Sequence, residues 1–309
     1  MATIAVAGGT GSVGKTIVRQ LLADGTHQVI VLGRKPPVVP LLPGAEFLVV
    51  GYSDVQGLVN ILEGRNVETV ISALDVFAPE GSQAQLNLIA ASDQSTKTRR
   101  FIPSEYAAAP DDGTNEWDVS AFARPAAAAL KKTGLQYTRV VVGFLMDYWG
   151  MPHIPSDMAP GVWAVDVANK RAAMPGTGNE PLTLTYSVDM AGFIARLLEV
   201  DEWPELSIIS GSDTTLNELI AIAEKVRGTK FDVVYDSQEK LERNEPTMLV
   251  HEAHGGISVE QMRQMNVLFG LATISGRMIV PKENRLNERL PDIRPMTIEE
   301  LITKAWAGK

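Results

Sequence analysis

The sequence predicts an α/β protein with a doubly wound parallel sheet. Its first residues read as strand, tight turn and helix, because an apolar run over 3–7 leads into glycines at 8, 11 and 14 and then into apolar residues at helical spacing. Farther along, short apolar runs alternate with segments of helical periodicity, which is the pattern of βαβ units. The two observations together predict a Rossmann-type sheet.

Composition narrows the class of protein. The 309 residues are 45% hydrophobic, carry a formal charge of -9 and include no cysteine. The acidic balance argues against nucleic acid as a partner, and the missing cysteines exclude disulfides and thiolate chemistry. No apolar run is long enough to span a bilayer, and a strand at residue 3 leaves no room for a cleavable leader, so we expect a cytoplasmic protein with no membrane partner.

The elements of the first half follow from apolar runs and their breakers. The expected strands are 3–7, 28–32, 46–50, 67–73, 100–103 and 136–143. Helices are expected after the glycine turn, through Leu58 and Leu62, over 85–92 and over 125–132. Prolines at 36, 37, 40 and 43 forbid a helix in the second crossover. Tyr52 either lies against an adenine or closes the sheet edge.

The second half continues the alternation. Strands are expected at 182–186, 207–210 and 232–235, with helices at 188–199, at 215–227 behind a threonine cap, and from residue 237 onward. We predict a nucleotide-binding domain over 1–150, which also receives a strand and a helix from about 182–200. Residues 151–309 then form mainly a substrate-binding cap domain.

The glycine turn predicts a dinucleotide site. Gly8 makes the turn, Gly11 lets the backbone approach a pyrophosphate, and Gly14 lets helix and strand pack closely. The phosphate would then lie on the free N–H groups of the helix N-terminus. Arg34 and Lys35 follow the second strand where an NAD-binding protein has an acid, which favours the 2′-phosphate of NADP.

Several motifs resemble those of one family. Gly8–Gly14, the stretch 100–105 (Arg-Phe-Ile-Pro-Ser-Glu), Leu-Thr-Leu-Thr at 182–185 followed by Asp189, and the segment 286–300 are similar to the NmrA-like and isoflavone-reductase-like group of atypical short-chain dehydrogenase/reductases, which includes phenylcoumaran benzylic ether reductases. The resemblance implies an NADP(H)-binding domain, a smaller C-terminal substrate domain and small aromatic or heterocyclic substrates. These pieces spread over nearly the whole chain.

The resemblance also assigns cofactor residues by position. The phosphate loop would comprise Gly8, Thr10, Gly11, Val13 and Gly14, and the 2′-phosphate would meet Arg34 and Lys35. The strand-end residues beside the nicotinamide would be Ser72, Ala73, Pro103, Ser104 and Glu105.

The chain departs from the family pattern at the expected proton donor. Reductases of this group rely on a lysine in the helix before the sixth strand, and that position falls on Ala123. No tyrosine has a lysine four residues later, so the acid of typical short-chain members is missing too. We expect another group to do this chemistry.

Candidate site residues come from the strand ends and from an aromatic stretch that follows the sixth strand. The catalytic candidates are Glu105, Arg124, Asp147 and Tyr148. Arginine can hold an anion but cannot donate a proton, and a carboxyl would need a raised pKa. The candidate substrate contacts are Tyr106, Trp149, Met151, His153 and Trp163. Tyr148, Trp149 and Trp163 also fit core positions.

Three functions fit these residues. The first is an NADPH-dependent reductase of a small aromatic or alkaloid-like secondary metabolite. The second is an NADP-binding enzyme of a non-redox step such as imine condensation or cyclisation, and the third is a dinucleotide-sensing regulator. The pair His251 and His254 is spaced by three rather than the four of a metalloprotease helix, so no metal site is expected. A monomer or homodimer is expected.

Overall fold

The computed structural model describes residues 1–38, 40–110, 120–253 and 256–309. The chain divides into two compact units. Unit 1 comprises 1–106, 120–141 and 190–207, and unit 2 comprises the described residues within 107–119, 142–189 and 208–309. His254 and most of the polar loop at 107–116 lie outside the described residues. Among the described residues, no helix is both long and apolar enough to cross a bilayer.

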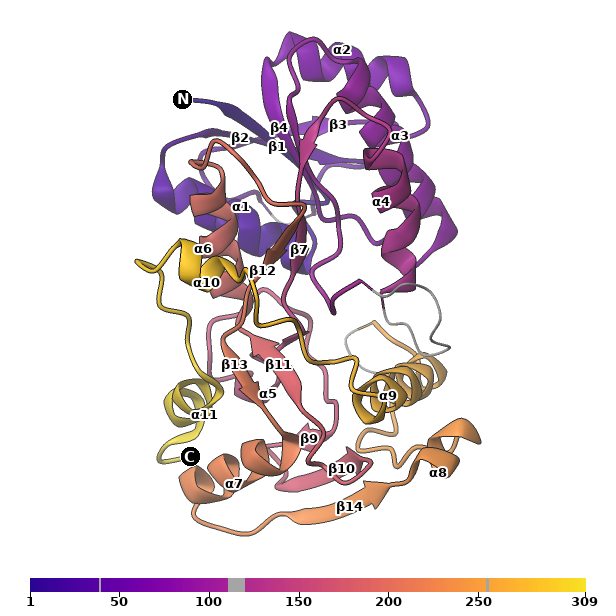
Figure 1. Ribbon diagram of the computed structural model, residues 1–309, viewed down its shortest axis with the longest axis vertical. Coiled ribbons are helices and arrows are strands. Elements are labelled where there is room, and N and C mark those ends of the chain that lie inside the picture. Colours follow the sequence, from indigo (N-terminus) through magenta and orange to yellow (C-terminus); the bar gives the residue numbers. More distant parts are fainter. Residues whose placement is uncertain (39, 111–119, 254–255) are drawn as a thin grey trace. The chain divides into compact units, whose positions relative to one another are not determined.

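Unit 1 is built on a six-stranded sheet with the order β3-β2-β1-β4-β5-β6 (Figure 1). Its strands are β1 (Thr3–Ala7), β2 (Gln28–Gly33), β3 (Ala45–Val49), β4 (Val67–Ser72), β5 (Arg100–Ile102) and β6 (Gln136–Tyr137). Every neighbouring pair is parallel. This order, in which the chain starts at the centre and winds out in both directions, confirms the doubly wound sheet.

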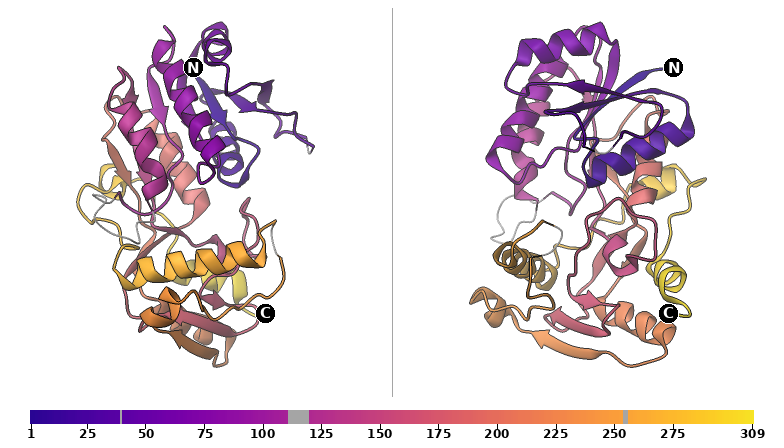
Figure 2. Two further views of the ribbon diagram at one scale, coloured as in Figure 1. Left: turned by 90° about the vertical axis from the view of Figure 1, so that its right-hand side faces the viewer. Right: turned by 180° about the vertical axis from the view of Figure 1, so that it is seen from behind.

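Helices cover both faces of this sheet (Figure 2). They are α1 (Ser12–Asp24), α2 (Val55–Gly64), α3 (Pro79–Gln94), the 3-10 helix η1 (Ala121–Ala123), α4 (Arg124–Leu130) and α6 (Ser187–Leu197), whose first turn belongs to unit 2. The helices α2, α3 and α4 lie side by side on one face, over a core that includes Leu62, Leu88 and Phe101. No helix forms in the described part of the proline-rich second crossover.

The expected sixth strand changes partner halfway along its length. Only β6 pairs with β5, and the chain then continues as β7 (Arg139–Val141), which pairs with β12 (Leu206–Ile208). The change occurs at Thr138, whose N–H still donates to the Phe101 carbonyl oxygen at 3.3 Å. The Arg139 N–H donates instead to the backbone carbonyl oxygen of Glu205 at 2.8 Å. The apolar run predicted a strand correctly but could not predict its second neighbour.

Unit 2 contains two small sheets and several helices. One sheet has the order β14-β10-β9 and the other has the order β13-β11-β8. Its strands are β8 (Phe144–Leu145), β9 (Val165–Asp166), β10 (Arg171–Pro175), β11 (Leu182–Thr185), β13 (Ser212–Thr214) and β14 (Asp232–Asp236). Its helices are α5 (Asp147–Gly150), α7 (Leu216–Arg227), α8 (Gln238–Glu242), α9 (Val259–Ile274), α10 (Leu286–Arg289) and α11 (Ile298–Trp306).

Unit 2 differs from the expected cap domain in four respects. Its second stretch begins at residue 142 rather than 151, and strand β11, which we assigned to the nucleotide domain, pairs instead with β8 and β13. The expected helix from residue 237 is the short α8, because Asn244 takes a left-handed backbone with φ 59°. Helix α9 was not predicted, since apolar residues are distributed all around it.

A half-buried carboxylate fixes the C-terminal segment of unit 2. Asp189, at the start of α6, accepts a hydrogen bond from the backbone N–H of Met296 at 2.7 Å. Burial raises the pKa of Asp189 from 3.8 to about 6, although this hydrogen bond lowers it. The folded state therefore binds this proton more tightly than the unfolded state does.

We expect the contribution of Asp189 to the stability of the protein to fall as the pH rises from about 4 to about 6. Because the folded pKa of Asp189 lies above the unfolded value, its contribution to the free energy of unfolding is largest below pH 4 and decreases through this window, by at most about 3 kcal/mol. Urea denaturation of wild type and Asp189→Asn between pH 4 and 7 measures this contribution as the pH-dependent part of their difference. A constant difference between the two proteins would contradict it.

Candidate functional site

The turn between β1 and α1 brings three backbone segments into close contact. Gly8 has φ +77°, which favours glycine, and a Cβ on it would lie 2.4 Å from the Ala73 carbonyl oxygen. A Cβ on Gly14 would lie 2.3 Å from the Gly8 carbonyl oxygen. Both glycines are therefore required by the protein's own packing.

Gly11 is different, because nothing in the protein requires a glycine there. Its φ of -80° and ψ of 173° suit any residue, and a Cβ would meet only the Gly8 carbonyl oxygen, at 3.4 Å. Gly11 is also the N-cap of α1, where no side chain caps the helix and no acid lies in the first turn. The free N–H groups of this turn remain available to an anion, whose approach a Cβ at Gly11 would obstruct.

The cations that follow β2 lie beside a fixed tyrosine. Arg34 and Lys35 are exposed. Tyr52 is buried, and its hydroxyl donates to the Leu32 carbonyl oxygen at 3.1 Å, so it closes the end of β2. Burial raises the pKa of Tyr52, and the charge of Arg34 lowers it. Of the other expected loop residues, Thr10 is exposed and Val13 is half-buried.

Hydrogen bonds tie the carboxyl ends of β4 and β5 together. The Ser104 hydroxyl donates to the Leu74 carbonyl oxygen at 2.9 Å, and its N–H donates to Gln85 at 2.8 Å. The Tyr106 hydroxyl donates to the Ser72 carbonyl oxygen at 2.8 Å. The expected nicotinamide residues Ser72, Ala73, Pro103 and Ser104 therefore belong to one braced edge of the sheet.

Two residues at this edge have unusual surroundings. Tyr106 has φ +32°, which is uncommon for a non-glycine residue, and its ring is buried, so in this structure it acts as a brace and has little surface for a substrate. Ser72 is fully buried, and its hydroxyl has no hydrogen-bond partner among the described residues. A buried hydroxyl without a partner is uncommon in a folded protein, and Ser72 is one of the residues expected beside the nicotinamide.

Glu105 forms a buried ion pair. The Nε of Arg139 donates to both carboxylate oxygens of Glu105 at 2.8 Å, and the two residues are 7% and 9% exposed. Burial raises the pKa of Glu105, whereas the hydrogen bond and the charge of Arg139 lower it. Because Ser104 and Tyr106 both contact the end of β4, Glu105 between them turns toward β7 instead.

Sequence analysis missed Arg139, although the signal was present. An arginine inside the run Tyr137-Thr-Arg-Val-Val-Val142 must find a partner if the strand is buried. The remaining candidate of unit 1, Arg124, is exposed at the first residue of α4. Ala123 just before it is 1% exposed, so the position of the family lysine faces the interior.

Asp147 of unit 2 is fully buried and hydrogen-bonded. It accepts from the Ser187 hydroxyl at 2.6 Å, from the Ser187 N–H at 3.0 Å and from the Ser156 hydroxyl at 2.7 Å. Burial raises the pKa of Asp147, and these hydrogen bonds lower it. The carboxylate joins α5, the loop that follows and the start of α6. This packing favours a structural role over contact with a substrate.

The aromatic stretch forms a cluster around Phe144. The ring centroid of Phe144 lies 4.6 Å from that of Trp163, 5.5 Å from that of Trp149 and 5.7 Å from that of Tyr148. Trp149 is 1% exposed and belongs to the core. Tyr148 is half-buried, and burial together with the charge of Asp147 raises its pKa, so its phenol is protonated at neutral pH.

The other expected substrate contacts vary in exposure. Met151 is half-buried against the core of unit 2. His153 is exposed, and its ring meets Trp306 edge-on at 4.7 Å. Of the four catalytic candidates, Glu105 and Arg124 belong to unit 1, and Asp147 and Tyr148 belong to unit 2.

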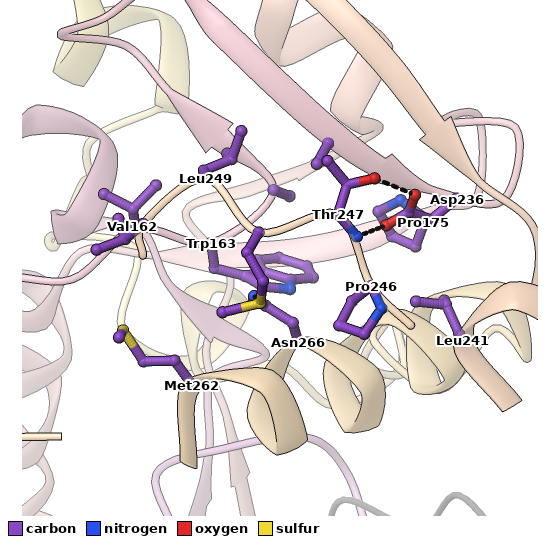
Figure 3. Close-up of a pocket in the computed structure, with 14 residues that line it drawn as sticks. Val162, Trp163, Pro175, Asp236, Leu241, Pro246, Thr247, Leu249, Met262 and Asn266 are labelled. Carbon is purple, nitrogen blue, oxygen red and sulfur yellow. Dashed lines mark hydrogen bonds between the residues drawn. The ribbon is translucent and has the colours of Figure 1, made fainter. Parts of the chain in front are cut away.

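A small pocket in unit 2 lies beside Trp163 (Figure 3). Its walls are the segment 246–250, β10 and α9, which contributes Met262 and Asn266. The free space is about 20 Å³, enough for one water molecule. Asp236 fixes Thr247 by accepting from its N–H at 2.6 Å and its hydroxyl at 2.7 Å. Sequence analysis missed this pocket, because its walls come from segments without a motif.

Comparison with known proteins gives one family. The model of the NmrA-like family matches residues 1–302. The oxidoreductase swnN of Metarhizium robertsii is 32% identical, over 100% of this chain and 98% of its own length. The oxidoreductase BOA1 of Botryotinia fuckeliana is 33% identical, with 96% of each chain covered.

A solved structure shares the fold. The structure described as AtPrR2 with NADP+ and (+)pinoresinol superposes with a TM-score of 0.72, covers 98% of each chain and is 21% identical. The likeness confirms the expected architecture, in which a Rossmann-type sheet is accompanied by further small sheets.

Two glycine variants separate ligand binding from packing. We expect Gly11→Ala to weaken NADPH binding at least tenfold while costing under about 1 kcal/mol of stability. Within the protein the new Cβ would make only an ordinary van der Waals contact with the Gly8 carbonyl oxygen, at 3.4 Å, whereas it would obstruct a bound phosphate. Gly14→Ala should instead destabilise the protein by about 1–3 kcal/mol, since its Cβ overlaps the Gly8 carbonyl. Calorimetric titration and urea denaturation measure the two quantities. Unchanged NADPH affinity in Gly11→Ala would contradict the first expectation.

Proposed function

This chain belongs to the NmrA-like family, and from that premise we propose that it is an NADPH-dependent oxidoreductase of the atypical short-chain type. Its substrate is a small aromatic secondary metabolite. The observation that carries the proposal is Gly11, a glycine that the protein's own packing does not require, at the uncapped N-terminus of α1. The names of the relatives swnN and BOA1, both oxidoreductases, support the reaction class.

The residues present fit NADP(H). The N-terminus of α1 would hold the pyrophosphate, with Gly11 allowing its close approach. Arg34 and Lys35 would hold the 2′-phosphate, since β2 is followed by these cations and not by an acid. The hydroxyl of Ser72, buried and without a partner among the described residues, would gain a hydrogen bond from the bound cofactor.

The reduced nicotinamide supplies a hydride when it is bound. The acceptor then gains negative charge that a protein group must hold or protonate. Arg124 can hold such an anion but cannot donate a proton. Among the four candidates, the phenol of Tyr148 is protonated at neutral pH, while Glu105 and Asp147 are engaged in internal hydrogen bonds. We therefore assign proton donation to Tyr148 ahead of the two carboxyl groups.

Arg34→Ala should remove most of the preference for NADPH over NADH. A charge-assisted hydrogen bond to the 2′-phosphate is worth about 1.5–3 kcal/mol, so the ratio of the two affinities should fall roughly 10- to 100-fold. Arg65→Ala is the matched control, because it removes the same charge from a surface pair with Glu46 and should leave the ratio unchanged. Equal affinities of the wild-type protein for the two cofactors would refute the assignment.

Turnover with a substrate panel tests the reaction class. We expect a member of a panel of aromatic imines, enones and benzylic ethers to gain two hydrogens while an equal amount of NADPH is consumed. Nicotinamide absorbance and product mass are followed together, with Tyr148→Phe as a variant that should lower kcat at least tenfold. Product without NADPH consumption would establish a non-redox enzyme instead.

A further inference from the structure

Phe77 is an apolar side chain that unit 1 leaves in solvent. It belongs to the connection between β4 and α3 and is 72% exposed. Among the described residues, the Phe122 ring of η1 accompanies it, with its centroid 4.5 Å away and its plane tilted by 40°. The two rings come from segments 45 residues apart and form a pair that only the fold creates.

The connection that carries Phe77 is tightly built. A Cβ on Gly81 would lie 1.6 Å from the Asp75 carbonyl oxygen, so α3 packs directly on the backbone of this loop. The N–H of Phe77 donates to the Asp75 carboxylate at 3.3 Å, and the preceding Val76 is 4% exposed. With Val76 anchored inside and Gly81 against the backbone, the loop geometry itself directs Phe77 outward.

The same connection begins at the candidate cofactor loop. Its first residues are Ala73 and Leu74. A Cβ on Gly8 would lie 2.4 Å from the Ala73 carbonyl oxygen and 3.2 Å from the Leu74 nitrogen. The connection also leaves β4 at its carboxyl end, where doubly wound sheets bind their ligands. Phe77 therefore lies in the tightly packed loop that begins at the edge that we assign to the cofactor.

We infer that Phe77 and Phe122 form a stacking platform that selects a planar aromatic group of the substrate. A ring held in water at a ligand-binding edge gains contact when a flat ring covers it, and offset or tilted stacking favours an aromatic group over a saturated one of the same size. The inference rests on the proposed function, because the stacked group is that of the hydride acceptor. It adds the residues that distinguish a planar substrate from a puckered one.

Two probes of equal size test the platform. The full-length protein is titrated by calorimetry with 2-naphthol and with its saturated analogue decahydro-2-naphthol, both with and without NADPH. We expect wild type to bind 2-naphthol at least tenfold more tightly, and Phe77→Leu to reduce that ratio by about two- to tenfold. Phe77→Leu should leave the affinity for NADPH unchanged.

A matched variant and a hydrodynamic measurement of the oligomeric state complete the test. Tyr235→Leu removes an exposed ring, 52% exposed on β14, and should leave the ratio of the two probes unchanged. The platform would be overturned if the wild type bound the two probes equally well, or if Phe77→Leu left the ratio of the two affinities unchanged. It would also be overturned if the wild type were a dimer that Phe77→Leu dissociates without changing this ratio. Failure of NADPH to bind would refute the proposed function alone, because the ratio is also measured without NADPH.

Discussion

The close contact of three backbones at Gly8 is the constraint on which unit 1 depends. The start of α1 touches Gly8 through Gly14, and the end of β4 touches it through Ala73, at distances that exclude any side chain. Because β1 lies at the centre of the sheet, this contact fixes the helix and the neighbouring strand end at once. The uncapped N-terminus of α1 and the braced carboxyl edge of β4 and β5 are consequently held as one surface.

Buried polar groups in this protein mostly connect segments. Glu105 and Asp147 each have a raised pKa, which is typical of a catalytic carboxyl group. Each is nevertheless surrounded by hydrogen-bond donors of the protein that leave it little freedom to act on a substrate. An unpaired buried carboxylate is costly, so the fold supplies Arg139 to one and two serine hydroxyls to the other. The exceptions are therefore more informative about ligands, such as the Ser72 hydroxyl, which has no hydrogen-bond partner in the part of the chain that the structure describes.

The order of elements in unit 1 could be predicted from the sequence nearly throughout. Apolar runs, glycines and prolines act locally, which is why the strands, the presence of the helices and the missing helix of the second crossover followed from them. The start of α3 did not, because this helix begins at Pro79 and not at residue 85. The pairing partners of the strands were predicted less well. The switch of the sixth strand to β12 and the pairing of β11 with β13 depend on residues far away in the chain.

The sequence by itself determined the glycine turn, the cations after β2 and the family, because each is carried by short motifs, although those of the family are spread along the chain. The tertiary structure decided which candidates are free to act. It paired Glu105 with Arg139, enclosed Asp147 and Trp149, and brought Phe77 to Phe122. These contacts join segments tens of residues apart, so their formation depends on packing and on the need to satisfy buried charge, which no local pattern records.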